Sequence, residues 1–347
     1  MEDVINFSTT RVNSSELNKD NYVSTENMLQ DYQGIVKAKS VPEDVNVVSF
    51  SCGDILISNI RPYLKKVWKA TFNGGCSSDV FVLKANDNIE SDYLHYVIAN
   101  DKFINFVMSG AKGVKMPRGD KKQMETYSLS LPQIQEQHKI ARLISLLDER
   151  IATQNKIIDK LQSLIKGISS RIFASIQGIE YRMGDIVTIT NGNSNVQDTV
   201  TQSKDGLYPF FDRSEDIKYL PTFLFDKEAI IYPGEGTEFM PRYFKGKFAL
   251  HQRCYAIFDF NEIINARFLY FYLKTRNSYF VKNAVGSTVP SLRLDTFQKL
   301  KVIIPSKKIQ HSVSLCLSSM EQKCNVEKKI LHKLLKQKQY LLRQMFI

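Results

Sequence analysis

Arginine and lysine gather in short clusters that could grip phosphate. Four fall in nine residues around Pro62, Tyr63 and Trp68, with no acidic residue among them: Arg61, Lys65, Lys66 and Lys69. A second, glycine-punctuated cluster offsets one aspartate: Lys112, Lys115, Arg118, Lys121 and Lys122. A third stands far along the chain: Arg242, Lys245, Lys247 and Arg253. Lysine and arginine neutralise phosphates, and arginine can also donate two hydrogen bonds to a guanine edge. We take these clusters, with Arg213 and Arg293, as candidate contacts; solvated surface charge is the alternative for any one residue.

Motifs of the common enzyme classes do not occur in the sequence. It has no G-x-x-x-x-G-K-[ST] phosphate loop, no G-x-S-x-G nucleophile turn and no H-E-x-x-H zinc pair. The Asn-Pro-Pro-aromatic element of amino-methyltransferases is also missing. His138 and His311 favour structural or partner-facing roles over catalysis. We therefore predict no catalytic residue, although scattered carboxylates leave a nuclease open as an alternative.

The five cysteines show no C-x-x-C spacing and no histidine cluster beside them. We expect reduced, buried thiols and no metal site. No apolar run of about 18 residues occurs, and the N-terminus lacks the pattern of a signal peptide. These observations predict a cytoplasmic protein without a membrane partner.

The net charge of +11 lies in two stretches. Residues 301–347 hold ten basic residues against two acidic ones, and residues 133–173 hold seven against four. The rest of the chain sums to zero. A basic surface attracts a nucleic acid backbone or an acidic partner, and a solvated helix face is the other interpretation.

The basic clusters must be positioned by the rest of the chain, and the sequence of that chain contains an internal repeat. Residues 113–173 match residues 286–346 at a constant offset of 173, without a gap. A repeat at a fixed offset predicts two equivalent halves related by an internal two-fold. The identical pairs include Gly113 and Gly286, Pro117 and Pro290, Gln137 and Gln310, His138 and His311, and Phe173 and Phe346.

Each repeat contains a long amphipathic helix. It is predicted to begin at Pro132 or Pro305, because proline suits a first helical position. About 41 residues at 1.5 Å each make a rod of roughly 60 Å. The apolar stripe follows 4-3 spacing, and its main members are Ile140, Ile144, Leu147, Ile151, Ile158 and Leu161 in the first helix and Val313, Leu317, Met320, Leu331, Leu334 and Leu341 in the second. This period, with Gln154 and Glu327 as polar breaks at one repeat position, predicts an antiparallel coiled coil; two ordinary core helices are the alternative.

Residues 1–131 and 176–304 have a different pattern. Short aromatic and β-branched runs, such as residues 54–57 and 229–232, are separated by Gly, Pro, Asn and Asp, which is typical of short strands in a mixed sheet. Short helical stretches at 93–98 and 268–273 correspond at an offset of 175. The fold prediction is an α+β protein with two inverted α/β domains separated by two long helices in an antiparallel coiled coil, with a pseudo-two-fold internal repeat.

The tract Leu131–Ala141 and the isoleucine-rich helix after it resemble the central spacer of the specificity subunits of type I restriction-modification systems. Further similarity lies in four short motifs: Tyr22–Met28, Gly53–Ser58, Val289–Arg293 and Leu342–Phe346. The resemblance covers essentially the whole chain. It implies a target-recognition domain at 1–131, a central spacer helix at 132–175, a second target-recognition domain at 176–304 and a C-terminal spacer helix at 305–347.

The resemblance also implies a function. Each domain would read one half of an interrupted site in double-stranded DNA, and the helices would act as a ruler for the bases between. The implied partners are two modification subunits, which bring S-adenosylmethionine, and restriction subunits, which use ATP and Mg. The chain itself would bind no cofactor and catalyse nothing. Two alternatives stay open: a nuclease or the specificity half of a fused DNA methyltransferase, and a coiled-coil interaction protein without a DNA role.

One departure concerns the first domain. The second opens with Tyr181–Val187, whereas the first begins inside the matching motif, at Glu2–Val4. We therefore expect the edge of the first domain to be incomplete or to be closed by the C-terminal helix.

Overall fold

A computed structural model describes residues 1–346. The last residue of the predicted C-terminal spacer helix, Ile347, lies outside the described residues. The chain divides into two compact units. Unit 1 contains Met1–Gln154 and the described residues from Ile330 onward, and unit 2 is Asn155–Lys329. Each unit therefore combines one globular part with a segment of each long helix.

The two long helices are α4 (Ile134–Ser175) and α8 (Lys307–Met345). Their predicted starts were wrong by two residues, because the prolines lie before the helices. The Gln137 N–H donates to the Gln133 carbonyl at 3.0 Å, and the Gln310 N–H donates to the Ser306 carbonyl at 3.0 Å. Gln133 and Ser306 are therefore the capping residues, and each proline precedes a cap.

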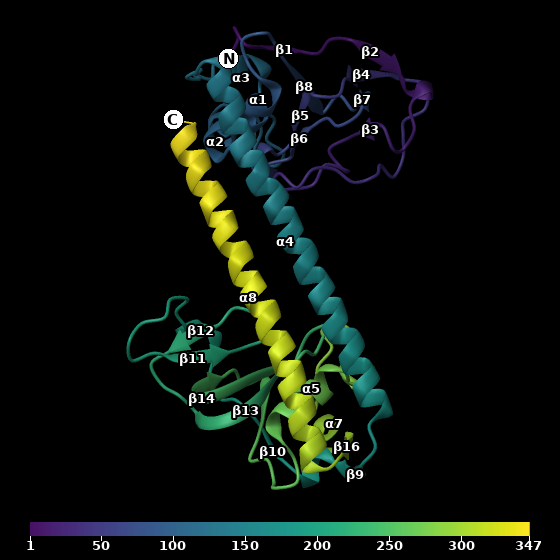
Figure 1. The fold of residues 1–347 in the computed structure, drawn as a ribbon, viewed down its shortest axis with the longest axis vertical. Coiled ribbons are helices and arrows are strands. Elements are labelled where there is room, and N and C mark those ends of the chain that lie inside the picture. The colour runs from purple at the N-terminus through teal and green to yellow at the C-terminus, as the bar shows by residue number, and fades with distance from the viewer. Residues whose placement is uncertain (347) are drawn as a thin grey trace. The chain divides into compact units, whose positions relative to one another are not determined.

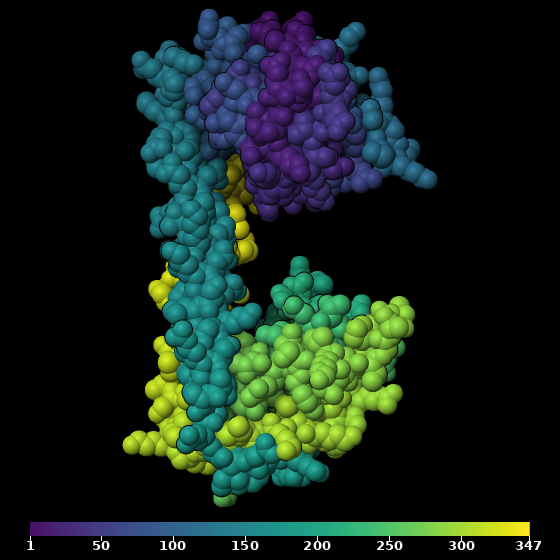
Figure 2. Space-filling model, turned by 90° about the vertical axis from the view of Figure 1, so that its right-hand side faces the viewer, coloured from purple at the N-terminus to yellow at the C-terminus, as the bar shows by residue number. Residues whose placement is uncertain are grey.

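The apolar stripes of both helices face inward within their units. All of the predicted stripe residues are buried or half-buried. In unit 1, Lys338 of α8 contacts Asp148 of α4 at 2.5 Å, while Leu342 and Phe346 of the C-terminal segment join Ile140 and Ile144 in one core. Higher numbers in α8 thus meet lower numbers in α4, so the two segments run antiparallel in unit 1. The opposite face of α4 stays in solvent along the helix (Figure 2).

Unit 1 contains two four-stranded sheets. Their orders are β1-β8-β5-β6 and β2-β4-β7-β3, antiparallel except for the parallel pair β3 and β7. The strands are β1 (Ile5–Phe7), β2 (Arg11–Asn13), β3 (Tyr22–Val23), β4 (Asn46–Phe50), β5 (Ile55–Ser58), β6 (Val67–Lys69), β7 (Gly74–Cys76) and β8 (Val80–Ala85). β5 is buried throughout because it is a central strand covered on both faces.

Three helices cover the first sheet of unit 1: α1 (Ser91–Ile98), α2 (Asp101–Ser109) and α3 (Lys121–Glu125) (Figure 1). Glu90 caps α1 by accepting the Tyr93 N–H at 2.7 Å. Tyr93 of α1 packs on Phe346 with ring centroids 5.1 Å apart. The end of the C-terminal helix therefore packs into the core of the first domain. Residues 128–131 form no strand in the described structure.

Unit 2 has a six-stranded sheet in the order β10-β15-β13-β14-β11-β12 and a separate pair, β16-β9. The strands are β9 (Ile179–Arg182), β10 (Thr188–Asn191), β11 (Tyr208–Phe211), β12 (Lys218–Leu220), β13 (Phe225–Pro233), β14 (Arg242–Leu250), β15 (Cys254–Phe258) and β16 (Lys301–Ile304). The order β10-β15-β13 repeats β1-β8-β5 of unit 1.

Helices α5 (Ala266–Lys274), α6 (Asn277–Asn283) and α7 (Leu294–Gln298) complete unit 2. Asn265 caps α5 as Glu90 caps α1, accepting the Phe268 N–H at 2.9 Å. Phe173, from the end of α4, packs edge-on against Phe268 and Tyr272, each at 5.5 Å between centroids. Phe173 and Phe346 thus fill equivalent places. Phe173 lies at the end of the helix that follows the first globular part and packs into the second, whereas Phe346 directly follows the helix after the second globular part and packs into the first.

The α+β class and the duplicated plan are confirmed. The expectation of buried cysteines is only partly right: Cys76, Cys254 and Cys324 are buried, but Cys52 and Cys316 are exposed because they lie on a turn and on the outer face of a helix. No helix among residues 1–346 is both long and apolar enough to cross a membrane.

Candidate nucleic-acid interface

A short hairpin stands at the same place in each unit. We call residues 112–118 and 285–291 the loop hairpins. The first is closed by Lys112 and Arg118, whose backbone groups exchange hydrogen bonds of 3.0 and 2.9 Å. The second is closed in the same way by Val285 and Ser291, at 2.9 and 2.8 Å.

Each loop hairpin is fixed to the end of a central strand by two more backbone bonds. In unit 1 the Gly119 N–H donates to the Asn59 carbonyl at 3.0 Å, and the Arg61 N–H donates to the Pro117 carbonyl at 2.8 Å. In unit 2 the Leu292 N–H donates to the Gly234 carbonyl at 2.8 Å, and the Gly236 N–H donates to the Pro290 carbonyl at 3.0 Å. The backbone scaffold is therefore the same in both units.

The repeated glycines of the loop hairpins are explained by backbone geometry. Gly113 has φ of +97° and Gly286 has φ of +102°. This left-handed region strains residues that carry a Cβ. The tips differ in chemistry, since the first exposes Val114, Lys115 and Met116 and the second has Ser287 and Thr288 instead.

An ion pair lies beside each loop hairpin, and its polarity is reversed between the units. In unit 1, Arg118 lies 3.6 Å from Asp79. In unit 2, Arg253 lies 2.7 Å from Glu235. The strand register makes Asp79 and Arg253 equivalent, because each directly precedes the residue that pairs with the last residue of β5 or β13. One position thus carries a carboxylate in one unit and a guanidinium in the other.

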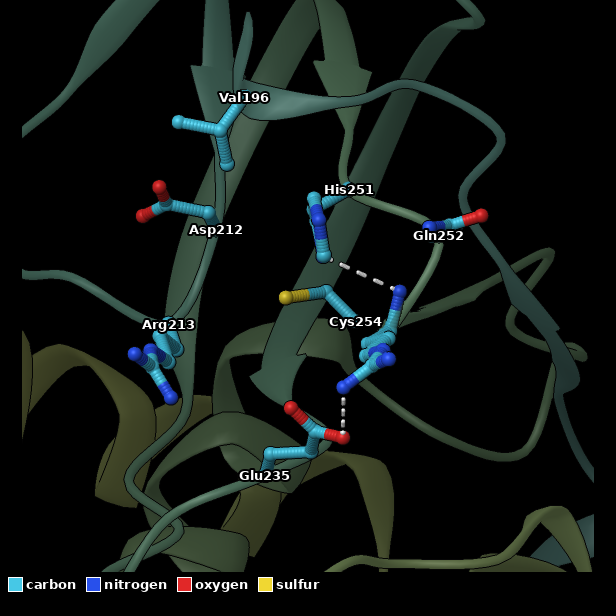
Figure 3. A pocket seen from close by; sticks show the side chains of 8 residues that line it. Val196, Asp212, Arg213, Glu235, His251, Gln252 and Cys254 are labelled. Atoms are coloured by element: carbon cyan, nitrogen blue, oxygen red, sulfur yellow. Dashed lines mark hydrogen bonds and ion pairs between the residues drawn. The ribbon is translucent and has the colours of Figure 1, made fainter.

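The unit 2 pair lies in a cleft of about 320 Å³ (Figure 3). Asp212 in its wall accepts hydrogen bonds from Lys218 at 2.6 Å and from the Ser214 N–H at 2.7 Å. Burial would raise the pKa of Asp212, but these bonds outweigh it and hold that pKa below its usual value. Burial raises the pKa of Cys254 to about 11, which keeps this thiol protonated. The cleft is lined by Val196, Asp212, Arg213, Glu235, His251, Gln252, Arg253 and Cys254.

His251 is a neutral hydrogen-bonding group in this cleft. Its Nδ1 accepts the Arg253 N–H at 3.2 Å (Figure 3). Burial lowers the pKa of His251. The charge of Asp212 opposes this effect and that of Arg253 adds to it, and the pKa stays below its usual value. A neutral ring that accepts at Nδ1 carries its proton on Nε2. His251 therefore offers a donor at Nε2.

Several predicted contacts of unit 1 also bind groups of their own unit. Lys65 pairs with Asp101 at 2.8 Å, and Lys69 pairs with Asp92. Lys66 donates to the Thr25 carbonyl at 2.5 Å, and burial lowers its pKa. Lys112 pairs with Asp120 at 3.1 Å. The clustering of lysines in the sequence thus arises in part from anchors of neighbouring loops.

Other predicted residues lie at the surface. Arg61 and Lys115 are exposed in unit 1, and Arg213, Lys245 and Arg293 are exposed in unit 2. Arg61 adopts φ of +52°, a left-handed conformation at the residue equivalent to Gly236. Such strain concentrates at functional sites. The assignment of these residues to DNA stays a prediction.

Arg242 is not among the residues that line the cleft. Its guanidinium donates to the Asp212 carbonyl and stacks over Phe211 at 5.3 Å. Burial lowers its pKa. Arg242 therefore positions the loop that carries Asp212 and Arg213.

The acidic and imidazole groups of the two sites were missed in the sequence. Asp79, Glu235 and His251 belong to no motif. The equivalent pair Asp79 and Arg253 stands at an offset of 174, between the two offsets that the repeat shows. Only the strand register shows that Asp79 and Arg253 occupy equivalent positions in the two units.

The first turn of each long helix holds the globular part with a glutamine. The Gln137 side chain accepts from the Glu90 N–H at 2.8 Å and donates to the carbonyls of Asn88 at 3.2 Å and Pro132 at 3.0 Å. The Gln310 side chain repeats this set with the Asn265 N–H at 2.7 Å and the carbonyls of Ile263 at 2.8 Å and Pro305 at 2.9 Å. We call these contacts the glutamine clamps. His138 and His311, one residue further on, are exposed.

Comparison with known proteins accounts for this repeated arrangement. A family model for the type I restriction modification DNA specificity domain matches residues 1–163 and 179–336. The chain belongs to this family. The two matches cover both globular parts and most of both long helices.

Curated members of the family align over shorter stretches. The EcoDI specificity subunit of Escherichia coli is 28% identical over 138 residues, which cover 40% of this chain and 30% of the relative. The MjaVIII specificity subunit of Methanocaldococcus jannaschii is 35% identical over 101 residues, 29% of this chain and 23% of the relative. The alignments thus span less than a third of each relative's own length.

Two solved structures share the fold of this chain. The S subunit of a type I restriction-modification system from M. genitalium superposes with a TM-score of 0.67 at 18% identity, covering 100% of this chain and 94% of the other. A chain from a structure of an assembled type I system gives 0.56 at 15% identity, with 96% of each covered.

Proposed function

We propose that this chain is the sequence-specificity subunit of a type I restriction-modification complex. In this function, unit 1 binds one half of an interrupted site in double-stranded DNA and unit 2 binds the other half. The observation that carries the proposal is the pair of loop hairpins, which share one backbone scaffold but present different side chains. A common scaffold with diverged surface groups suits two readers of different base sequences.

The glutamine clamps support two equivalent partner sites. Each fixes the start of a long helix to its globular part with the same three hydrogen bonds. Next to each clamp stands the same exposed histidine, His138 or His311. Two equivalent places that carry the same clamp and the same histidine suit two copies of one modification subunit. Restriction subunits complete the proposed complex.

The chemistry of the complex is proposed to lie on those partners. S-adenosylmethionine would be bound by the modification subunits, and ATP and Mg by the restriction subunits. This chain would catalyse neither methylation nor cleavage, and would supply orientation and sequence choice, in the cytoplasm. Its own residues act by binding DNA phosphates and base edges.

The proposal is tested by assembling the full chain with the modification subunit of its own system and mapping methylated adenines. We expect methylation at one bipartite sequence. Arg61→Ala and Lys115→Ala should lower DNA affinity or methylation while assembly persists, because both side chains are exposed. Lys245→Ala is the control. It removes an exposed positive charge from unit 2, so it should leave the sequence of the half-site bound by unit 1 unchanged.

Two outcomes would contradict the proposal. One is cleavage or methylation of DNA by the purified chain without a partner, which would make it an enzyme. The other is an assembled complex that binds no specific duplex, which would leave a coiled-coil interaction protein.

A further inference from the structure

We propose that the reversed ion pairs discriminate bases: Arg253 of unit 2, held by Glu235, reads a guanine edge, and Asp79 of unit 1, held by Arg118, reads an amino group of cytosine or adenine. This inference rests on the proposed function and names the residues that set its sequence choice.

The pairs stand at one place in the common scaffold. Asp79 and Arg253 precede equivalent strand residues, Val80 and Cys254, which pair with the ends of β5 and β13. The loop hairpin is bonded to the same strand end in both units. The position therefore keeps its backbone place while its charge, and with it the group that it can contact outside the chain, is reversed.

Stability does not account for these pairs. The Arg253 side chain is 62% exposed and the Arg118 side chain is 57% exposed. Exposed ion pairs contribute little to folding, because water screens them. Glu235 and Asp79 are less exposed, at 19% and 34%, so in each pair the carboxylate is the recessed member.

The unit 2 cleft presents donors. Arg253 carries a forked set of N–H groups, His251 offers Nε2–H, and Arg213 lines the same cleft. Asp212, in the wall of the cleft, accepts hydrogen bonds from Lys218 and from the Ser214 N–H. Guanine presents two acceptors, N7 and O6, in the major groove, and arginine is the usual partner of that edge. Glu235 orients the Arg253 fork through the 2.7 Å contact.

In the unit 1 site a carboxylate stands at this position instead. Asp79 occupies the place of Arg253, and its backbone carbonyl accepts the Asn59 N–H at 2.8 Å. The Asp79 side chain is 34% exposed and lies 3.6 Å from Arg118. A carboxylate accepts from the amino groups of cytosine N4 or adenine N6. At this one position, unit 2 therefore presents a donor and unit 1 an acceptor.

The test uses the full chain assembled with its modification subunit and a duplex pool randomised in both half-sites. Bound duplexes are sequenced for the wild type, Arg253→Ala, Arg253→Lys, Glu235→Gln and Asp79→Asn. Arg182→Ala is the matched control, because it removes an exposed arginine from another strand of unit 2. Lysine at position 253 keeps the positive charge but lacks the forked N–H donors of the guanidinium. The Arg253→Lys variant therefore still tests guanine recognition if Arg253→Ala weakens assembly.

We expect the wild type to select guanine at one position of the unit 2 half-site. Arg253→Ala and Arg253→Lys should each reduce that preference by about tenfold or more and leave the other half-site unchanged. Glu235→Gln should weaken it at the same position. Asp79→Asn should relax one position of the other half-site, and Arg182→Ala should change no preference.

Retention of the guanine preference in both Arg253 variants would overturn the inference while the proposed function stands. Equal weakening at every position would also overturn it, since that result identifies a phosphate contact. If the assembled wild type selects no bipartite sequence, the proposed function fails and the inference fails with it.

Discussion

Gln137 and Gln310 show how a single side chain can join a helix to a domain. Each is almost fully buried, at 1% and 0% exposure, and each satisfies three backbone groups. The sequence marks both as repeated residues. It does not show their role, because two of the three partners of each glutamine lie more than 40 residues away, in loops without a motif.

We predict that Gln137→Ala lowers the free energy of unfolding of unit 1 by about 3 kcal/mol, because buried backbone groups lose their partners and a cavity opens. Trp68 is the only tryptophan and lies in β6 of unit 1, so its fluorescence in urea reports that unit. Gln310→Ala makes the same change in unit 2 and serves as the control. An unaltered Trp68 transition in Gln137→Ala would contradict the clamp.

His95 makes unit 1 sensitive to acid. Burial lowers the pKa of His95 to about 4, and Lys338 acts in the same direction against Asp148. Its Nδ1 has no hydrogen-bond partner in the described structure. The unfolded chain binds a proton near pH 6.5, whereas the folded chain does not until about pH 4. Stability is therefore present above pH 6.5 and is lost as the pH falls toward 4.

We predict that the wild type loses about 2 kcal/mol through His95 between pH 7 and pH 5. His95→Phe should lack this part of the pH dependence, because phenylalanine fills the site without titrating. Urea unfolding followed by Trp68 at both pH values measures the difference. Parallel pH profiles for the two proteins would show that His95 is not the group responsible.

At the scale of elements, glycines in a hairpin and in a helix should respond oppositely to alanine. Gly286 has φ of +102°, and a Cβ there would lie 2.9 Å from the Val289 carbonyl oxygen. Gly167 lies inside α4, with nothing within 4 Å of a Cβ. Backbone strain governs the first position, and helix propensity governs the second.

We predict that Gly286→Ala destabilises its loop hairpin by about 1–3 kcal/mol. Hydrogen exchange of the Ser291 amide should become faster, since that N–H closes the hairpin on Val285. Gly167→Ala should instead stabilise α4 by about 0.5–1 kcal/mol. Unchanged exchange at Ser291 would mean that the loop hairpin tolerates a Cβ by rearranging.

Much of the element structure was predictable from the sequence. The runs 54–57 and 229–232 became β5 and β13, and the stretches 93–98 and 268–273 became α1 and α5. The spacing of apolar residues is a local property of the sequence, so it predicts helices and strands without knowledge of tertiary contacts. The ion pairs were not predictable, because Asp79 meets Arg118 only through strand register and a hairpin that docks on β5. The ion pairs of Lys65 with Asp101 and of Lys69 with Asp92 could not be predicted for the same reason.

At the scale of the molecule, each unit is completed by a helix end from the other repeat. Phe346 packs on Tyr93 in unit 1, and Phe173 packs on Phe268 and Tyr272 in unit 2. We predict that Phe346→Ala lowers the stability of unit 1 by about 3–5 kcal/mol, because it empties a buried aromatic site. The Trp68 transition should shift in this variant and should not shift in Phe173→Ala, the equivalent change in unit 2.

The glutamine clamps and the terminal phenylalanines also bear on how such a protein can change its target. These contacts are made by Gln137, Gln310, Phe173 and Phe346, which are identical in the two repeats. The glutamines bind backbone groups of a loop, and the phenylalanines pack on the capped helices α1 and α5. A foreign globular part would have to supply an aromatic side chain over Phe346, a loop for Gln137 and an apolar face for Ile140 and Ile144. In the proposed function, the residues that join a globular part to the helices are therefore different from the residues that would contact DNA.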